Sequence, residues 1–217
     1  MPTPNPNQLI VEGHDDLFAV VALMKSHIGW PEDRGLAPVQ IEIGKSAREI
    51  LKASYLTTIL KTPGLRNIGI VLDADSVPKG RYDSIRSICS QFFTALPVEL
   101  PAGGLVISEN GQRFGVWIMP DNHSDGCLET FLRNLVPDQS EDLWSLATGS
   151  VQTARSLGAP WRTPHLPKAN LYTWLAWQDP PGQNPGRALT QRILNVSSPS
   201  AVPFVKWFRR LYEIPES

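Results

Sequence analysis

The sequence predicts an α/β fold in which helices flank a mostly parallel β-sheet. Short apolar segments alternate with longer segments that carry apolar side chains at helical spacing, which is the order expected of strand–helix–strand units. The chain has 217 residues, 41% hydrophobic and 19% charged, so it can bury a core and is not disordered by composition. Its 20 prolines and 16 glycines predict many loops and abrupt ends of helices and strands.

The first strand and helix follow a short lead rich in proline and asparagine. Residues 8–12 (QLIVE) form a short apolar strand that stops at Gly13. Residues 15–28 then carry apolar side chains at helical spacing. Residues 39–43 (VQIEI) alternate between apolar and polar, which predicts the second strand.

The next helix is marked by Ser46 and Glu49, which match the S-x-x-E capping box and open a helix that we expect to reach about residue 61. Residues 67–72 (NIGIVL) form a third, fully apolar strand. A helix over residues 82–96 follows it. The chain up to this point therefore alternates strand and helix three times.

Two further strands are expected at residues 105–108 and 114–119. Asn110-Gly111 between them is a hairpin signal, so these strands should be antiparallel to each other and extend the sheet. A helix over residues 126–135 completes an α/β domain that we place at residues 1–137.

Residues 138–217 change in character, because they contain no convincing strand and are rich in tryptophan and proline. We expect a helical extension packed on the α/β domain. Its predicted helices cover residues 139–156, 168–178, 185–195 and 200–212.

Charge is distributed unevenly along a chain whose net charge is only −1. Residues 1–150 contain 12 Lys and Arg against 18 Asp and Glu, whereas residues 151–217 contain 8 against 3. An acidic body with a basic tail suits a cation site beside a surface that faces phosphates, although chance segregation remains an alternative. The candidate nucleic-acid-binding residues are Arg187, Arg192, Lys206, Arg209 and Arg210.

The two cysteines, Cys89 and Cys127, are far apart, which excludes a disulfide framework and a zinc ribbon. The N-terminus has neither the basic nor the apolar region of a signal peptide, and the longest apolar run is too short to span a membrane. We therefore expect a cytoplasmic protein without a membrane partner.

Acidic residues gather where the predicted strands end. Glu12 closes the first strand, Asp73 and Asp75 close the third, and Asp121 follows the last. Ligands of open α/β sheets bind at this edge, and residues two apart on an extended segment project to the same side. Asp16 lies four residues after Glu12, at the start of a helix. The alternative is that these acids only cap helices and turns.

Converging carboxylates are costly, because two like charges about 4 Å apart repel by roughly 4 kcal/mol at an effective dielectric constant of 20. A bound cation removes this cost. Carboxylate oxygens without His or Cys favour Mg²⁺ or Mn²⁺ over zinc, so one or two such ions are the expected cofactors.

Glu12-Gly13-His14-Asp15-Asp16 at the end of an apolar strand, with Asp73-Ala74-Asp75 about sixty residues later, resembles the Toprim domain over residues 8–135. The resemblance implies a Rossmann-like sheet. It also implies that Glu12 acts as general acid/base or metal ligand, that Asp73 and Asp75 hold Mg²⁺, and that Gly13 permits the tight turn. Asp16 matches an acid that OLD-type nucleases, one branch of this family, use for a second metal ion.

Some branches of the family do not fit. Topoisomerases usually show D-x-D-x-D, but position 77 is Val, and primases carry a zinc module that two lone cysteines cannot build. A small stand-alone Toprim protein related to the OLD-type nucleases fits best. Because those nucleases carry an ATPase module that this chain lacks, a separately encoded ATPase is a conceivable partner, and a homodimer is another.

Downstream candidates are Asp121, Asp125 and Glu129, in the segment PDNHSDGCLE. Asp125 and Glu129 are four apart on an expected helix and could complete the metal shell; alternatively, Asp125 caps the helix and Glu129 is solvated. Lys168 resembles the downstream lysine of OLD-type enzymes, which stabilises charge on the phosphate, but it could also be an ordinary surface lysine.

Our first hypothesis is a Mg²⁺- or Mn²⁺-dependent phosphodiester hydrolase that acts on nucleic acid. The alternative is a non-catalytic Toprim module that binds nucleic acid or nucleotide, or docks on a partner ATPase. A phosphotransferase of the haloacid-dehalogenase type also uses D-x-D. Its nucleophile normally ends the first strand, however, and here that strand ends in Val-Glu-Gly.

Overall fold

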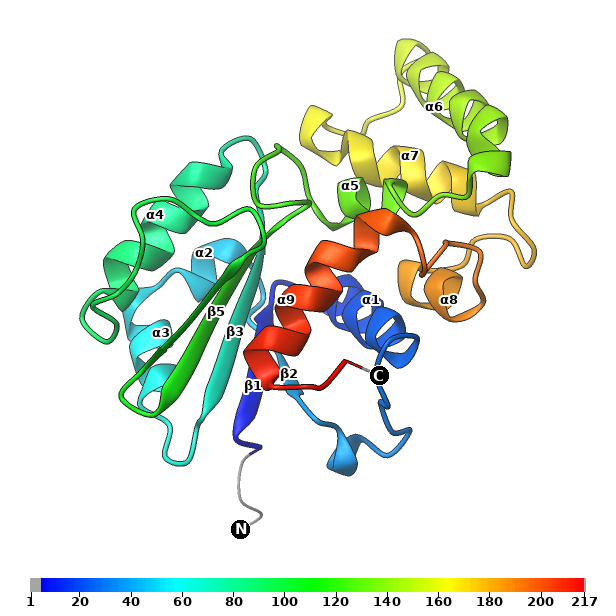
Figure 1. The fold of residues 1–217 in the computed structure, drawn as a ribbon. Coiled ribbons are helices and arrows are strands. Elements are labelled where there is room, and N and C mark those ends of the chain that lie inside the picture. The colour runs from blue at the N-terminus through cyan, green and yellow to red at the C-terminus, as the bar shows by residue number, and fades with distance from the viewer. Residues whose placement is uncertain (1–4, 217) are drawn as a thin grey trace.

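The computed structural model describes residues 5–216, and a five-stranded sheet runs through the middle of the molecule (Figure 1). Its strand order is β2-β1-β3-β5-β4, and all neighbours are parallel except β4 and β5. The strands are β1 (Asn7–Val11), β2 (Gln40–Ile43), β3 (Asn67–Asp73), β4 (Leu105–Glu109) and β5 (Gln112–Met119). The predicted α/β class is confirmed.

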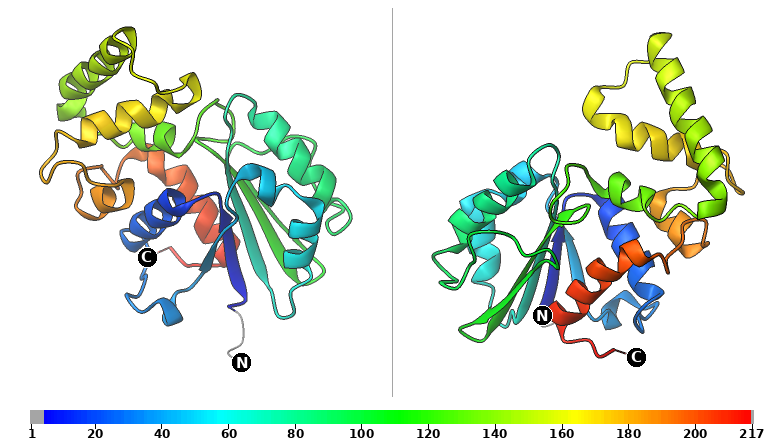
Figure 2. Two further views of the ribbon diagram at one scale, coloured as in Figure 1. Left: turned by 180° about the vertical axis from the view of Figure 1, so that it is seen from behind. Right: turned by 45° about the horizontal axis from the view of Figure 1, so that its top comes forward.

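Helices cover both faces of the sheet (Figure 2). On one face lie α2 (Ala47–Ile50), α3 (Ala53–Leu60) and α4 (Pro78–Cys89). On the other lie α1 (His14–Lys25) and α9 (Val202–Tyr212). Side chains of a strand alternate between these layers: Ile10 packs with the first set of helices, whereas Leu9 and Val11 pack with the second.

The C-terminal helix α9 belongs to the core of the sheet, although it is separated from β3 by more than 120 residues of chain. It packs on β3, β4 and β5, and its Trp207 Nε1 donates a hydrogen bond to the Leu105 carbonyl (2.9 Å). The close approach depends on Gly69 and Gly115, which are paired across β3 and β5. A Cβ at either glycine would lie within 3 Å of Leu211.

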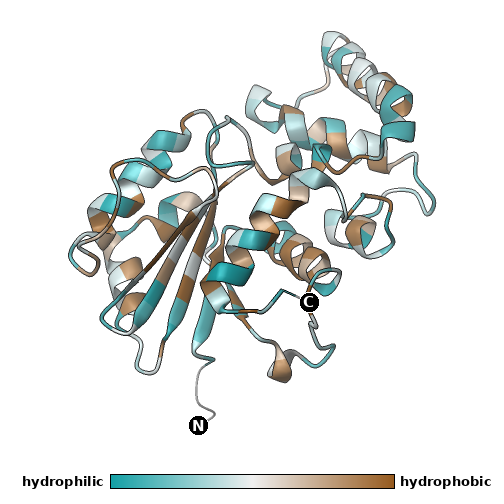
Figure 3. Cartoon of the chain, in the orientation of Figure 1, coloured by the Kyte–Doolittle hydropathy of each residue, from teal (hydrophilic) through white to brown (hydrophobic). Residues whose placement is uncertain are grey.

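The remaining helices form a lobe beside the sheet. Helices α6 (Glu141–Ser156) and α7 (Leu166–Leu175) pack against each other, α5 (Leu128–Arg133) contacts α7, and α8 (Pro185–Thr190) packs on α1. Figure 1 shows the α6–α7 pair standing away from the sheet, and Figure 3 shows that the brown, apolar residues of the helices are interrupted by polar ones. Trp144 and Trp174, with ring centroids 6.2 Å apart, join α6 to α7.

The helix expected over residues 46–61 is instead two helices, α2 and α3. Ser46 caps the first, since its hydroxyl accepts from the Glu49 N–H (3.3 Å), but the chain becomes extended at Lys52 before it turns into α3. The break lets Ile50 and Leu56 both become fully buried, whereas on one continuous helix they would lie about 120° apart. No helix in the described part of the chain is long and apolar enough to cross a membrane.

The other predicted boundaries need smaller corrections. The helix expected over residues 82–96 begins earlier and ends earlier, as α4, with Pro78 in its first turn. The helix expected over residues 126–135 is shorter, as α5. The four C-terminal helices and the hairpin at Asn110-Gly111 are present; both turn residues have positive φ, as that hairpin type requires.

Candidate functional site

The carboxyl ends of β1, β2, β3 and β5 meet at one edge of the sheet, and Glu12 lies there directly after β1. β1 has β2 on one side and β3 on the other, so the chain order reverses at this strand. Glu12 Oε1 accepts a hydrogen bond from the Asp73 N–H (2.8 Å), and Oε2 accepts one from the Ala47 N–H (2.9 Å). The carboxylate is therefore held between the end of β3 and the first residue of α2, at the switch point where open sheets bind ligands.

Asp16 and Asp73 are held in the same way, each by one oxygen. Asp16 Oδ2 accepts from the Gly13 N–H at the start of α1 (2.9 Å), and Asp73 Oδ1 accepts from the Leu128 N–H at the start of α5 (2.9 Å). The other oxygen of each carboxyl group receives no hydrogen bond from another residue that the structure describes. One acceptor oxygen of each is thus left for a ligand.

The ionised forms of these groups are disfavoured. Burial, and then the charge of Glu12, raise the pKa of Asp16 to about 7. Burial, followed by the charges of Asp16, Glu12 and Glu129, raises the pKa of Asp73 to about 9. Burial likewise raises the pKa of Glu12 against the lowering effect of its two backbone hydrogen bonds. Glu12, Asp16, Asp73 and Glu129 therefore lie close enough to interact. Asp16 and Asp73 hold their protons to a higher pH than ordinary surface acids do.

Glu129 completes this group, which we call the acid cluster: Glu12, Asp16, Asp73 and Glu129. It lies on α5 and is only 7% exposed, so the expectation of a solvated side chain is wrong. The Cys127 thiol lies 3.1 Å from its Oε2. Burial and the charge of Glu129 raise the pKa of that thiol to about 12.

Asp125 does not share a helix face with Glu129. Helix α5 begins only at Leu128, with Cys127 rather than Asp125 as its N-cap. Asp125 lies before it on an exposed stretch of loop. The interpretation of Asp125 as the helix cap is therefore wrong, and so is the helical spacing on which its pairing with Glu129 was based.

The D-x-D spacing predicts that the side chains of Asp73 and Asp75 project to the same side of an extended strand, and the structure does not show this. The strand ends at Asp73, and Asp75 has a φ of 53°, so the alternation of side chains stops. Its carboxylate, 62% exposed, forms an ion pair with Arg81 of α4, whose Nε donates to the Asp73 carbonyl (3.2 Å). Asp75 remains near enough to Glu12 to raise its pKa.

Lys168 of α7 reaches the acid cluster from the lobe. Its Nζ lies 3.2 Å from Asp15 Oδ2 and 3.5 Å from Glu129 Oε1. The Tyr172 hydroxyl donates to the same Asp15 oxygen (3.1 Å). Burial lowers the pKa of Lys168, but the charge of Glu129 and the hydrogen bond to Asp15 outweigh it and raise this pKa overall. The roles of Asp15 and Tyr172 were not predicted from the sequence. The available signal for Tyr172 was its spacing of four residues from Lys168, which places both side chains on one face of a helix.

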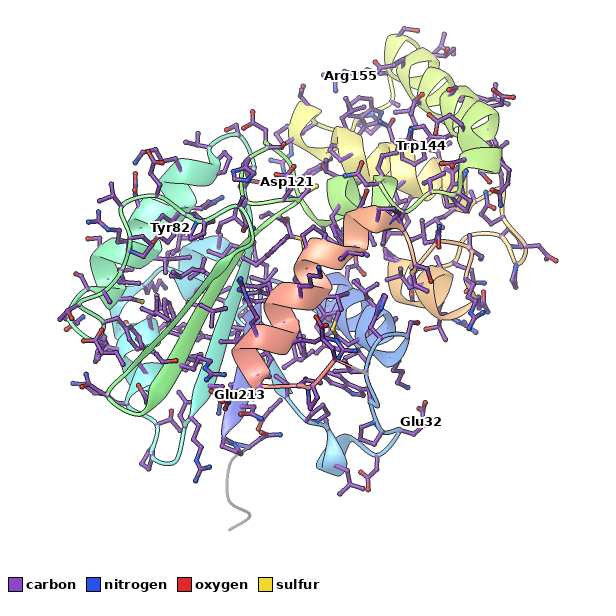
Figure 4. All side chains as sticks on the ribbon, in the orientation of Figure 1. Glu32, Tyr82, Asp121, Trp144, Arg155 and Glu213 are labelled. Carbon is purple, nitrogen blue, oxygen red and sulfur yellow. The ribbon has the colours of Figure 1, made fainter. Side chains whose placement is uncertain are left out.

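The remaining candidates lie apart from the cluster. Asp121 closes a turn in the loop after β5, where its carboxylate accepts from the backbone N–H groups of His123 and Ser124 (3.0 and 2.7 Å; Figure 4). Burial raises the pKa of Asp121, but these hydrogen bonds lower it by more. No interaction joins Asp121 to the acid cluster in the described part of the chain.

Two of the five basic residues expected to bind nucleic acid hold the fold together. Arg209 donates to the carbonyls of His27 and Pro215, and Arg210 donates to those of Gly103 (2.8 Å) and Gly104 (3.0 Å). The exposed residues of the five are Arg187, Arg192, Lys206 and Arg210. Arg187 lines a cavity of about 1190 Å³ between α1, β2 and α8, and none of the acid cluster's residues lines it.

Within residues 5–216, no three His, Cys, Asp or Glu side chains are arranged as they stand to hold a metal ion. The donors are nevertheless of the right kind, because they are carboxylate oxygens, two of which are free of hydrogen bonds. Burial first, and the neighbouring carboxylates second, raise the pKa values of Asp16 and Asp73, and a divalent cation would offset both effects. The donors are thus of the kind that a hard cation takes, although as they stand they form no ligand set.

Comparison with known proteins gives one match. A family model described as "Protein of unknown function (DUF3226)" matches residues 6–213, almost the whole chain. No curated protein and no solved structure matches.

Proposed function

The chain belongs to the DUF3226 family of proteins of unknown function, and we propose that it is a Mg²⁺- or Mn²⁺-dependent phosphodiester hydrolase that acts on nucleic acid. One observation carries the proposal: four carboxyl groups converge at the switch point of the sheet with pKa values of about 7 and about 9 at two of them. The resemblance of the Glu12 and Asp73 segments to the Toprim domain supports the same chemistry.

The residues divide between holding a cation and moving a proton. Asp16 and Asp73 each offer one free oxygen, and Glu129 lies beside both. A divalent cation bound there supplies a water of lowered pKa and neutralises charge on the phosphate. Glu12 is fixed by two backbone N–H groups and has a raised pKa, which suits a group that takes up the proton of an attacking water.

The cationic side chains border this group. Lys168 lies within 3.5 Å of Glu129 and is 53% exposed, so its ammonium group can turn toward a phosphate and stabilise the charge that develops in the reaction. Asp75, which is also exposed, can leave Arg81 and add a carboxylate to the site. Asp121 would assist only after the turn at His123 and Ser124 opened.

A second function draws on the Lys168 contact itself. The lysine already neutralises part of the charge of Asp15 and Glu129, and the acids are not arranged as a closed ligand set. A non-catalytic module that binds nucleic acid or nucleotide, alone or docked on a partner ATPase, requires neither a metal ion nor a closed set of metal ligands. Divalent-cation binding separates the two functions, since the hydrolase requires it.

The test is nicking of supercoiled plasmid with Mn²⁺, Mg²⁺ or chelator. We expect cation-dependent nicking by the wild type that Glu12→Gln and Asp73→Asn abolish. Both substitutions keep the size of the side chain and an oxygen acceptor. Asp125→Asn is the matched control, because Asp125 is an exposed aspartate outside α5, and its nicking should equal that of the wild type.

The results distinguish the two functions. Nicking that survives Glu12→Gln and Asp73→Asn would remove the acid cluster from the reaction. No nicking with either cation, together with no heat of Mn²⁺ binding by calorimetry, would reject the hydrolase and favour the binding module. Nicking lost in Asp125→Asn as well would show that the variants act through folding, which circular dichroism of each variant checks.

A further inference from the structure

The α6–α7 lobe carries an unusual charge pattern. Residues 143–178 contain no Asp or Glu, but they contain Arg155, Arg162 and Lys168 as well as His165. These four side chains are all exposed. Three of them fall within the seven residues that lead into and begin α7, so the positive charge is concentrated where the two helices join.

The loop between α6 and α7 is held in shape by Arg155, which Figure 4 labels at the end of α6. Its guanidinium lies over the Trp161 ring, 4.3 Å from the centroid, and donates to the Trp161 carbonyl (3.1 Å) and the Thr163 hydroxyl (3.2 Å). Arg155 is therefore a positioning residue. Its contacts hold the loop closed and fix the orientation of Arg162, which lies between Trp161 and Thr163.

Arg162 contacts no carboxylate among the described residues. Its guanidinium lies 3.3 Å from His165 Nε2, and no ion pair of Arg162 or Arg155 occurs in residues 5–216. Arg81, Arg113 and Arg133 each pair with an acid, whereas Arg162, like Arg66 and Arg187, forms no ion pair among the described residues. Arg162 thus presents an uncompensated positive charge to solvent.

This loop leads directly to the acid cluster. His165 and Lys168 are three residues apart at the start of α7, so they lie on one side of the helix, and Lys168 contacts Asp15 and Glu129. Arg162, His165 and Lys168 therefore form a row that ends at the carboxylates. We call this row the cationic track.

We propose that the cationic track binds the sugar-phosphate backbone of a nucleic-acid strand and leads it to the acid cluster. The inference rests on the proposed function for the identity of the ligand. Successive phosphates would contact Arg162 and Lys168, because arginine and lysine are the usual partners of phosphate oxygens. The cationic track is a different surface from the basic residues of α8 and α9 that the sequence predicts to bind nucleic acid. Two of those residues, Arg209 and Arg210, donate hydrogen bonds to main-chain carbonyls.

The experiment measures binding without cleavage. A short fluorescein-labelled oligodeoxynucleotide, single-stranded or duplex, is titrated with the full chain in chelator, and fluorescence anisotropy is recorded from about 50 to about 200 mM salt. The variants are Arg162→Ala and Arg162→Lys. Arg66→Ala is the matched control, since Arg66 is an exposed arginine directly before β3, at the opposite edge of the sheet.

Loss of one phosphate contact lowers the slope of log affinity against log salt by about 0.7 for a single strand and about 0.9 for a duplex. The advantage of the wild type over Arg162→Ala should accordingly shrink about threefold across that fourfold range of salt. Arg162→Lys should retain most of the affinity because it keeps the charge. Arg66→Ala should match the wild type in both affinity and slope.

Equal slopes for the wild type and Arg162→Ala would overturn the proposal. Binding to phosphatidylserine vesicles with none to either oligonucleotide would overturn it too, because the track would then serve an anionic membrane surface. The assay contains chelator, so it measures binding of the oligonucleotide whether or not the protein cleaves nucleic acid. A negative result here therefore rejects the cationic track, and a negative nicking result rejects the hydrolase.

Discussion

Replacing Asp73 with asparagine should make the protein more stable at neutral pH. In the unfolded chain an aspartate has a pKa of about 3.9, whereas burial and the neighbouring carboxylates raise the pKa of Asp73 to about 9 in the folded protein. At pH 7 folding must therefore bind a proton at this group. Each pH unit above the unfolded pKa costs about 1.4 kcal/mol, which gives a cost on the order of 4 kcal/mol at pH 7.

The sign of the pH dependence follows from the same values. Because the folded pKa is the higher one, the contribution of Asp73 to stability is fully present below about pH 4 and is lost as the pH rises toward 9. Asp16, with a pKa of about 7, adds the same trend between about pH 4 and 7. Stability of the wild type should fall between pH 5 and pH 8 in the absence of divalent cations.

Asp73→Asn removes the titrating group but keeps an Oδ1 that can accept from the Leu128 N–H. Urea unfolding at several pH values should show a higher free energy of unfolding at pH 7, by up to about 4 kcal/mol, and a flatter pH profile. For a chain of this size the thermal midpoint rises on the order of 10 °C. Asp125→Asn should leave both quantities unchanged.

Divalent cations should reduce the stability advantage of Asp73→Asn over the wild type. At about 100 times its Kd, Mn²⁺ should stabilise the wild type by about 2.7 kcal/mol and Asp73→Asn by much less. A variant that is less stable than the wild type at pH 7, or one that retains the wild-type pH profile, would refute the claim that Asp73 is held against charge repulsion and burial.

Three further outcomes follow from the packing. Tyr172→Phe removes the hydrogen bond to Asp15 and should cost about 1 kcal/mol, with hydrogen exchange rising in α6 and α7; unchanged protection there would contradict an anchoring role. Gly69→Ala would place a Cβ 2.8 Å from Leu211 and should lower the urea midpoint by the equivalent of about 1–3 kcal/mol, so an unaltered midpoint would speak against tight packing of α9. Burial raises the pKa of Cys127 to about 12, so a thiol reagent should modify it slowly at pH 7 until urea unfolds the chain; fast modification of the folded protein would contradict this.

The fold could be predicted well from the sequence because its strands are compact apolar runs and its helices repeat at 3.6 residues. The errors fall where tertiary packing overrides local signals. No Pro or Gly marks the break near Lys52, which arises because Ile50 and Leu56 are drawn into the same core. The role of α9 as a cover of the sheet could not be predicted either, since Gly69 and Gly115 signal a close approach but not which helix makes it.

The acid cluster was predictable in part. Glu12, Asp16 and Asp73 end or follow predicted strands, and parallel strands bring such ends together whatever the details of the loops. Asp75 could not be placed, because the sequence does not reveal that the backbone turns to positive φ directly after the strand. The pairing of Lys168 with Asp15 spans 153 residues and depends on how the lobe folds back over α1.

Capping alone does not account for the acid cluster, although the structure shows that its members do cap. Glu12 accepts from the first residue of α2, Asp16 from the start of α1, and Asp73 from the first residue of α5. The hydrogen bonds accepted by Asp16 and Asp73 could equally be accepted by the neutral amide oxygen of an asparagine of the same size. A neutral cap would avoid the repulsion and burial that raise the pKa of Asp73 to about 9. Carboxyl groups therefore stand where uncharged acceptors would give the more stable protein, and a cation that the group must bind is the physical reason we infer for retaining their charge.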